Sequence, residues 1–278
     1  MKPVIQKWMI LMAVAAAPAG AAVFTAAGAN PAAIETSVNA FRAALGANNG
    51  VGAPAASGRR EVNWDGVPNS FAAPNNMPGN FFNSNSPRGI VFSTPGTGFG
   101  VSSTAASGVP VRFGNIDASY TDEFQTFSAE RLFTVIGSNQ LQIDFFVPGT
   151  TTPATVFGFG AIFSDVELAS TTIYSVFLGD GSSGGQFAVP VSGDGGLSFL
   201  GLTDPNRYSR IVIQFGNVAM GAGVVDNPQD LVDVVAMDDF IYGEPLAARA
   251  EVPEPSTGAL AAAGACLLAV LRRKTHLS

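Results

Sequence analysis

Two pairs of acidic residues are the strongest candidates for chemistry in this 278-residue chain. Asp165 and Glu167 stand at positions i and i+2 near the end of a predicted strand, so both carboxylates point to the same side of it. Asp238 and Asp239 interrupt a predicted strand that is apolar on both faces. A carboxylate buried in such a strand must be paired with a cation, hydrogen-bonded or bound to a metal.

Carboxylate and carbonyl oxygens are the ligands that calcium prefers. The sequence therefore predicts a calcium site that includes Asp165, Glu167 and Asp239, with backbone carbonyls from the loop 63–69 as further ligands. For Asp239, a cap on loop amides or a pair with an arginine is an equally simple interpretation, and the candidate arginines are Arg88, Arg112, Arg131 and Arg210. For Asp238 a structural partner, either an arginine or a loop amide, is the favoured interpretation.

Other site chemistries are excluded because residues 1–265 contain neither cysteine nor histidine. Cys266 is the only cysteine and His276 the only histidine, and both lie near the C-terminus. The preceding residues therefore contain no Ser-His-Asp or Cys-His arrangement, no disulfide, and no zinc or copper site built from imidazole and thiolate. We expect a protein without catalytic activity and without catalytic residues.

Sugar binding is an alternative, because aromatic rings on a sheet surface can stack on sugars. Trp64, Tyr120 and Tyr208 are the candidate rings, in a binding module that could depend on calcium. A carbohydrate-active hydrolase is a second alternative. Its two carboxylates would be Asp165 and Glu167, since glycosidases use two carboxyl groups about 5–10 Å apart.

The elements that must position these residues are mostly strands. Segments of alternating apolar residues recur at intervals of about 8–15 residues from position 111 onward, with turn residues between them. This spacing predicts an antiparallel β-sandwich or jelly roll over residues 31–248. The loop 148–153 is predicted to join the strands around 141–147 and 157–163 as a hairpin.

One amphipathic helix is predicted over residues 31–45. Its apolar residues recur with helical spacing, at Ile34, Val38, Phe41 and Leu45. The Asn30-Pro31 step is a start signal, and Gly46 is a stop signal.

Both ends of the chain carry export signals. Residues 1–21 combine two lysines, an apolar stretch and an Ala-rich cleavage region, which predicts a signal peptide followed by a linker over 22–30. Residues 249–256 are predicted to form a second linker, and 257–278 a short transmembrane helix with a basic end. The apolar run 258–271 would span about 21 Å as a helix, less than the ~30 Å of a full bilayer core.

The C-terminal segment resembles a PEP-CTERM sorting signal. The match consists of Pro253-Glu254-Pro255, the apolar run, and the basic cluster Arg272, Arg273 and Lys274. The resemblance implies a Gram-negative bacterium that makes exopolysaccharide, with processing by an exosortase-type membrane enzyme. It also implies an inner-membrane-anchored precursor that is later sorted to the envelope, the cell surface or the extracellular matrix.

Residues 35–245 are similar to an uncharacterised group of secreted bacterial PEP-CTERM proteins. The similarity is carried by segments such as "GRREVNWDGVP", "SPRGIVFSTPGTGF" and "VVAMDDFIYGEP". The closing strand with Asp-Asp-Phe also resembles the last strand of jelly-roll domains. The group implies no enzyme activity.

The charge of the chain limits the kinds of partner it can bind. Two lysines lie near the N-terminus and three basic residues in the tail, which leaves nine arginines and no lysine between them. All 21 acidic residues fall in that interval, so it carries about −12 charges. An acidic surface argues against nucleic acid as a partner. We therefore expect a non-catalytic surface or matrix protein, associated with exopolysaccharide, ahead of the calcium-dependent glycan-binding module and the hydrolase.

Overall fold

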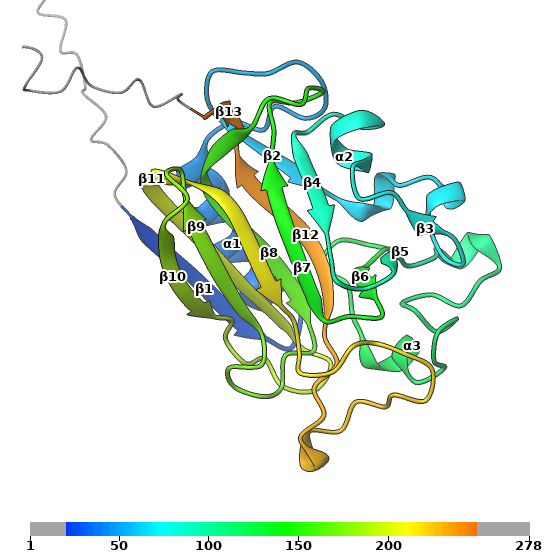
Figure 1. Cartoon of the computed structure of the whole chain (residues 1–278). Helices are drawn as coiled ribbons and strands as arrows, with labels where there is room; N and C mark the ends of the chain where they lie inside the picture. The colour runs from blue at the N-terminus through cyan, green and yellow to red at the C-terminus, as the bar shows by residue number, and fades with distance from the viewer. Residues whose placement is uncertain (1–20, 249–278) are drawn as a thin grey trace, which may run out of the picture. The chain divides into compact units, whose positions relative to one another are not determined.

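The computed structural model describes residues 21–248, which form a mainly β structure with one long helix (Figure 1). The predicted signal peptide, sorting motif and C-terminal helix lie outside the described residues. No helix within the described residues has the length and apolar character to cross a membrane. The strands are β1 Ala22–Gly28, β2 Arg59–Val62, β3 Asn76–Met77, β4 Ile90–Ser93, β5 Gly98–Val101, β6 Phe133–Ile136, β7 Gln140–Phe145, β8 Ala154–Ser164, β9 Ile173–Leu178, β10 Ser183–Ala188, β11 Leu197–Gln214, β12 Ala236–Gly243 and β13 Leu246–Ala247. The α-helices are α1 Pro31–Leu45, α2 Phe81–Ser84 and α3 Tyr120–Glu123.

Helix α1 confirms the predicted helix at both ends. Asn30 caps its N-terminus by accepting a hydrogen bond from the Ala33 N–H, and Gly46 ends it with a positive φ of 97°. The four residues of the predicted apolar stripe are all buried. They pack against residues of β8, β11 and β12, including Ile162, Phe199 and Ile241.

The strands form one curled antiparallel sheet, a half-barrel, rather than the predicted two-sheet sandwich or jelly roll. Strand β11 causes the difference, because it is 18 residues long and its two halves pair with different strands. Its first half pairs with β1 and β8, and its second half pairs with β7 and β9. One long strand that is shared by both sets of partners keeps all of them in a single hydrogen-bonded sheet.

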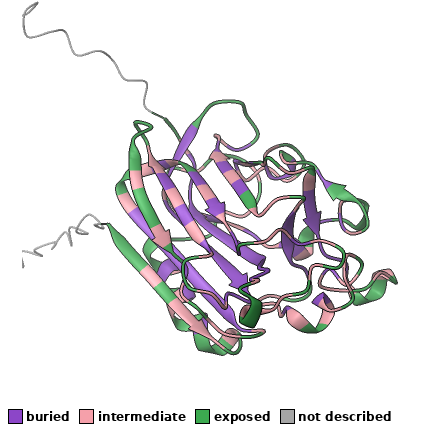
Figure 2. Cartoon of the chain, turned by 60° about the horizontal axis from the view of Figure 1, so that its bottom comes forward, coloured by how far each residue is buried: buried purple, intermediate pink, exposed green. Residues whose placement is uncertain are grey.

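The main core lies inside the curl, where buried strand faces meet (Figure 2). Trp64 is fully buried there, and its ring stacks on Phe133 with centroids 4.1 Å apart. Its indole N–H donates to the Asp238 carbonyl at 2.9 Å. Each large apolar side chain buried in this way contributes about 1.5–3 kcal/mol to folding.

Two local predictions differ from the structure. Residues 22–28, predicted as part of a linker, form strand β1 and pair with β11 along their whole length. The predicted hairpin around 148–153 is reduced to a single bridge between Phe146 and Pro153, because β7 pairs with β4 and β11 instead of β8.

A third apolar cluster holds two loop regions together at one end of the sheet. Phe113, Tyr120 and Phe124 from the segment around α3 pack with Met220 and Val234 from the β11–β12 connection. The Tyr120 hydroxyl donates to the Val224 carbonyl at 2.6 Å and accepts from the Gly221 N–H at 3.2 Å. This contact brings α3 and the β11–β12 connection to the end of β8, where the candidate site lies.

Candidate functional site: an acidic cluster at the end of β8

Asp165 follows the last residue of β8 and is fully buried. Its backbone adopts a left-handed conformation, with φ of 73°, which aspartate tolerates better than most residues. Its N–H donates to the Gly196 carbonyl at 2.8 Å, and its Oδ1 accepts from the Gly195 N–H at 2.8 Å. Its Oδ2 has no hydrogen-bond partner.

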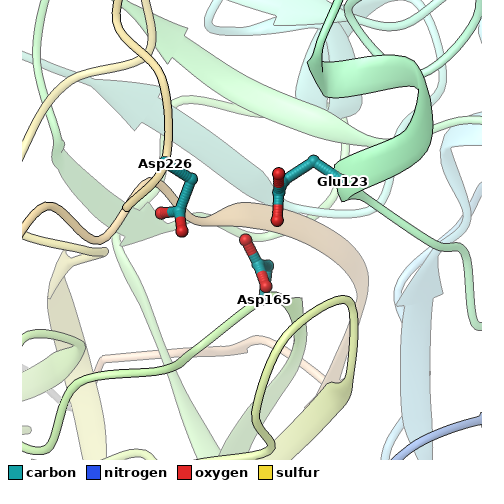
Figure 3. Close-up of side chains that lie close together, drawn as sticks. All are labelled: Glu123, Asp165 and Asp226. Atoms are coloured by element: carbon teal, nitrogen blue, oxygen red, sulfur yellow. The ribbon is translucent and has the colours of Figure 1, made fainter. Parts of the chain in front are cut away.

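Two carboxylates from distant segments face Asp165. Glu123 is the last residue of α3, and Asp226 lies in the β11–β12 connection. One oxygen from each of the three side chains can be chosen so that all three atoms lie within 4.8 Å of one another. Figure 3 shows the three side chains pointing toward a common centre.

A second group shares Asp165 with the first. Its other members are Glu167, two residues beyond Asp165, and Asp194 in the turn before β11. These three carboxylates also offer oxygens within 4.8 Å of one another. We use the term acidic cluster for the five residues of both groups, which are Glu123, Asp165, Glu167, Asp194 and Asp226.

The electrostatics of the acidic cluster disfavour its charged form. Burial, together with the neighbouring carboxylates, raises the pKa of Asp165 to about 9 and that of Glu167 to about 8. The pKa of Glu123 is raised for the same reasons. Between residues 21 and 248 no salt bridge involves any member of the acidic cluster, although five such contacts form elsewhere in that range.

Asp239, the third predicted calcium ligand, lies outside the acidic cluster. Its Oδ1 accepts from the Ser128 hydroxyl at 2.9 Å, and its Oδ2 lies 3.8 Å from a guanidinium nitrogen of Arg42. Burial raises its pKa to about 6. Arg42 of α1 forms its close ion pair with Glu61, at 2.8 Å, so Asp239 has a hydroxyl donor and a guanidinium nearby rather than a hydrogen-bonded arginine.

Asp238 and Asp65, which lies in the loop 63–69, accept hydrogen bonds from backbone N–H groups. Asp238 accepts hydrogen bonds from the Phe127 N–H at 2.6 Å and the Asp239 N–H at 2.8 Å. Burial and the adjacent carboxylate raise its pKa well above the usual range. In the loop, Asp65 accepts from the Arg131 N–H at 2.8 Å. The Asp65 side chain therefore caps a neighbouring segment of the chain.

The three predicted sugar-binding aromatics require a correction. Trp64 and Tyr120 are fully buried, and Tyr208 is 3% exposed. An aromatic ring stacks on a sugar only with an exposed face, so these rings are core residues in this conformation. Trp64 and Tyr208 belong to the main core, and Tyr120 to the apolar cluster around α3.

Three members of the acidic cluster were not found from the sequence. Glu123, Asp194 and Asp226 are separated from Asp165 by 42, 29 and 61 positions, and no motif connects them. The one local signal was the turn "SGDGG" around Asp194, which also describes an ordinary hairpin turn.

The C-terminal segment matches a known family model. Residues 251–274 match the PEP-CTERM protein-sorting motif. No curated protein and no solved structure matches this chain. The chain therefore carries a PEP-CTERM motif, which implies an exported protein that an exosortase sorts to the cell envelope.

Proposed function

We propose that this chain is a non-catalytic protein of the cell surface or extracellular matrix, associated with exopolysaccharide. The observation that carries the proposal is the sorting motif over residues 251–274. On this proposal a C-terminal helix holds the precursor in the inner membrane until an exosortase acts on it. The curled sheet is then the part that reaches the cell surface.

The geometry of the acidic cluster supports a role without catalysis. A glycosidase needs one carboxylate that is ionised as nucleophile or base and one that is protonated as acid. Asp165 and Glu167 both have a pKa raised to about 8 or 9, and Asp165 is fully buried. A sugar could not reach Asp165, and neither residue would be ionised at neutral pH in the metal-free protein.

The sorting part of the proposal is tested by the basic cluster. Replacing Arg272, Arg273 and Lys274 together by glutamine should leave the protein in the membrane fraction of a host that has an exosortase. Arg249→Gln is the matched control, because it removes a positive charge just before the motif. Fractionation with immunodetection of each variant measures the outcome. Unchanged processing of the triple variant would contradict the proposal.

The absence of catalysis is tested separately on the purified full-length protein. We expect no release of reducing ends from a panel of neutral and acidic polysaccharides. Release that disappears in Asp165→Asn would show that the acidic cluster is catalytic and would overturn this part of the proposal.

A neutral-glycan site is a second candidate function, favoured by one pocket. The pocket has a volume of about 450 Å³ and is lined by Asn75, Asn76 and Asn115 together with Phe113 and Met220. The amides can hydrogen-bond to the hydroxyl groups of a neutral sugar, and the apolar side chains can contact the faces of its ring. Retention of the protein on an immobilised neutral polysaccharide tests this. Asn76→Ala should lose retention while Asn206→Ala, in the exposed bend of β11, keeps it.

A further inference from the structure

We propose that the acidic cluster binds one calcium ion between Glu123, Asp165 and Asp226, with Glu167 and Asp194 beside it. This goes beyond the sorting function, since it concerns the described sheet and its loops rather than the C-terminal motif. The ion would connect α3, the end of β8 and the β11–β12 connection, which are three segments far apart in the chain.

The first observation is the state of Asp165. It is fully buried, its Oδ2 has no hydrogen-bond partner, and its side chain points toward Glu123 and Asp226 (Figure 3). An ionised carboxylate left without a partner in the interior is strongly unfavourable. Either a proton shared with a neighbouring carboxylate or a bound cation must compensate it.

The second observation is that two other buried carboxylates lie beside an arginine, while Asp238 is held by backbone N–H donors. Glu244 forms a fully buried pair with Arg60 at 2.7 Å, and Asp239 lies 3.8 Å from Arg42. The acidic cluster holds more carboxylates than either of these sites. Yet none of its members forms an ion pair with any of the arginines in residues 21–248. A compensating charge from outside the chain fits this difference.

The spacing of the oxygens suits a calcium ion. Calcium lies about 2.3–2.6 Å from its ligands, so two ligands on opposite sides of it are up to about 5 Å apart. The carboxylate oxygens of Glu123, Asp165 and Asp226 lie within 4.8 Å of one another. All available side-chain ligands are oxygens, which favours a hard cation over zinc or copper.

The position of the ion gives it a mechanical role. The β11–β12 connection is already tied to the α3 segment by the Tyr120 hydroxyl and by Asp117, whose Oδ2 accepts from the Gly223 N–H at 2.9 Å. A cation held by Asp226, Glu123 and Asp165 would fasten the same connection directly to the sheet. Extracellular calcium sites commonly have Kd values of about 10⁻⁴–10⁻³ M, within reach for an exported protein.

The experiment uses the full-length protein purified in detergent and stripped of metal with a chelator. Calcium chloride titration by calorimetry should show one site, and thermal unfolding should shift upward in calcium. At a calcium concentration about 100-fold above Kd, the rise in Tm should be on the order of 5–10 °C. Magnesium should give a smaller rise because it demands shorter distances and strict octahedral geometry. Sodium chloride at matched ionic strength reports general screening alone.

Four variants decide between a specific site and a general effect of charge. Asp165→Asn, Glu123→Gln and Asp226→Asn should each abolish the calcium shift. Asp122→Asn is the matched control, since Asp122 is exposed on the same short helix as Glu123, and it should keep the shift. Asparagine preserves the size of Asp165 and tolerates its left-handed backbone, so Asp165→Asn should unfold at or above the wild-type Tm in chelator.

Three results would overturn the proposal. The first is an equal shift in calcium and in matched sodium chloride. The second is a calcium shift that persists in Asp165→Asn, and the third is an equal loss of the shift in Asp122→Asn. Magnesium shifts as large as those of calcium would overturn the choice of ion.

Discussion

The Arg60–Glu244 pair and the acidic cluster around Asp165 are two buried sites at which the same sheet carries carboxylates. Arg60 donates to both oxygens of Glu244, at 2.7 and 2.8 Å. Its remaining N–H groups reach backbone carbonyls such as that of Ala53 at 2.7 Å. Glu244 also accepts from Asn49 at 2.8 Å. At Asp165, by contrast, one oxygen has a hydrogen-bond donor, the other has none, and the nearest charged groups are further carboxylates.

The comparison shows two ways to compensate a buried carboxylate. The counter-charge can come from a side chain of the same protein, or it can come from a proton or cation in the solvent. A buried ion pair whose hydrogen bonds are all made depends only on folding. A buried group of like charges depends on protons or cations, so its stability changes with pH and with metal concentration. The first site therefore needs no ion from outside the chain, while the second makes part of the fold conditional on pH and on cation concentration.

The largest expected effect is the loss of the internal partner. Arg60→Met should lower the free energy of unfolding by about 3–5 kcal/mol, because it leaves Glu244 buried without its cation. Arg60→Met combined with Glu244→Gln should cost less than Arg60→Met alone, since no buried charge remains. Urea denaturation of the single and double variants measures this. A double variant as unstable as the single one would mean that packing, and not charge, dominates the site.

The next effect is a pH dependence of the metal-free protein. A carboxyl group whose pKa is raised on folding stabilises the folded state below its unfolded pKa, near 4, and loses that contribution as the pH rises through its folded pKa. For Asp165 and Glu167 the loss should extend to about pH 8–9. The slope is about 1.4 kcal/mol per pH unit for each retained proton. Unfolding in chelator at pH 6, 7, 8 and 9 should show decreasing stability, whereas increasing stability over this range would contradict the raised pKa values.

A smaller effect separates Asp165 from the other buried carboxylates. In chelator at pH 8, Asp165→Asn should raise the free energy of unfolding by about 1–3 kcal/mol, because it removes a buried group that lacks a partner. It should also flatten the pH dependence, while Asp239→Asn should not do so above pH 7, since the pKa of Asp239 is about 6. A destabilised Asp165→Asn protein with the wild-type pH slope would show that Asp165 is an ordinary hydrogen-bonding residue.

The smallest effect is expected at an exposed ion pair on the same sheet. Arg210 and Asp144 pair across β11 and β7 at 2.8 Å, with side chains 46% and 26% exposed. Water screens such a pair, so Arg210→Gln should change the free energy of unfolding by less than about 1 kcal/mol. The change should shrink further in high salt. A cost as large as that of Arg60→Met would show that burial does not explain the difference between the two sites.

The sequence by itself determined the features that depend on neighbouring residues. The helical spacing from Ile34 to Leu45, with Asn30 before it and Gly46 after it, predicted α1 to the residue. The sorting motif over 251–274 is likewise a continuous signal. The predicted strand that carries Asp238 and Asp239 is present as β12. The absence of cysteine and histidine before position 266 restricted any side-chain metal ligands in that part of the chain to oxygen atoms.

Only the tertiary structure decided which distant segments meet. The long strand β11 turned the predicted sandwich into a curled sheet, recruited β1 as a strand and separated β7 from β8. The same topology brought Glu123 and Asp226 to Asp165 and placed Arg42 near Asp239. Local patterns report which face of a strand is apolar, but contacts across many tens of residues depend on the order of strands in the sheet. That order is set by how all the apolar faces are buried together, so no short stretch of sequence contains it.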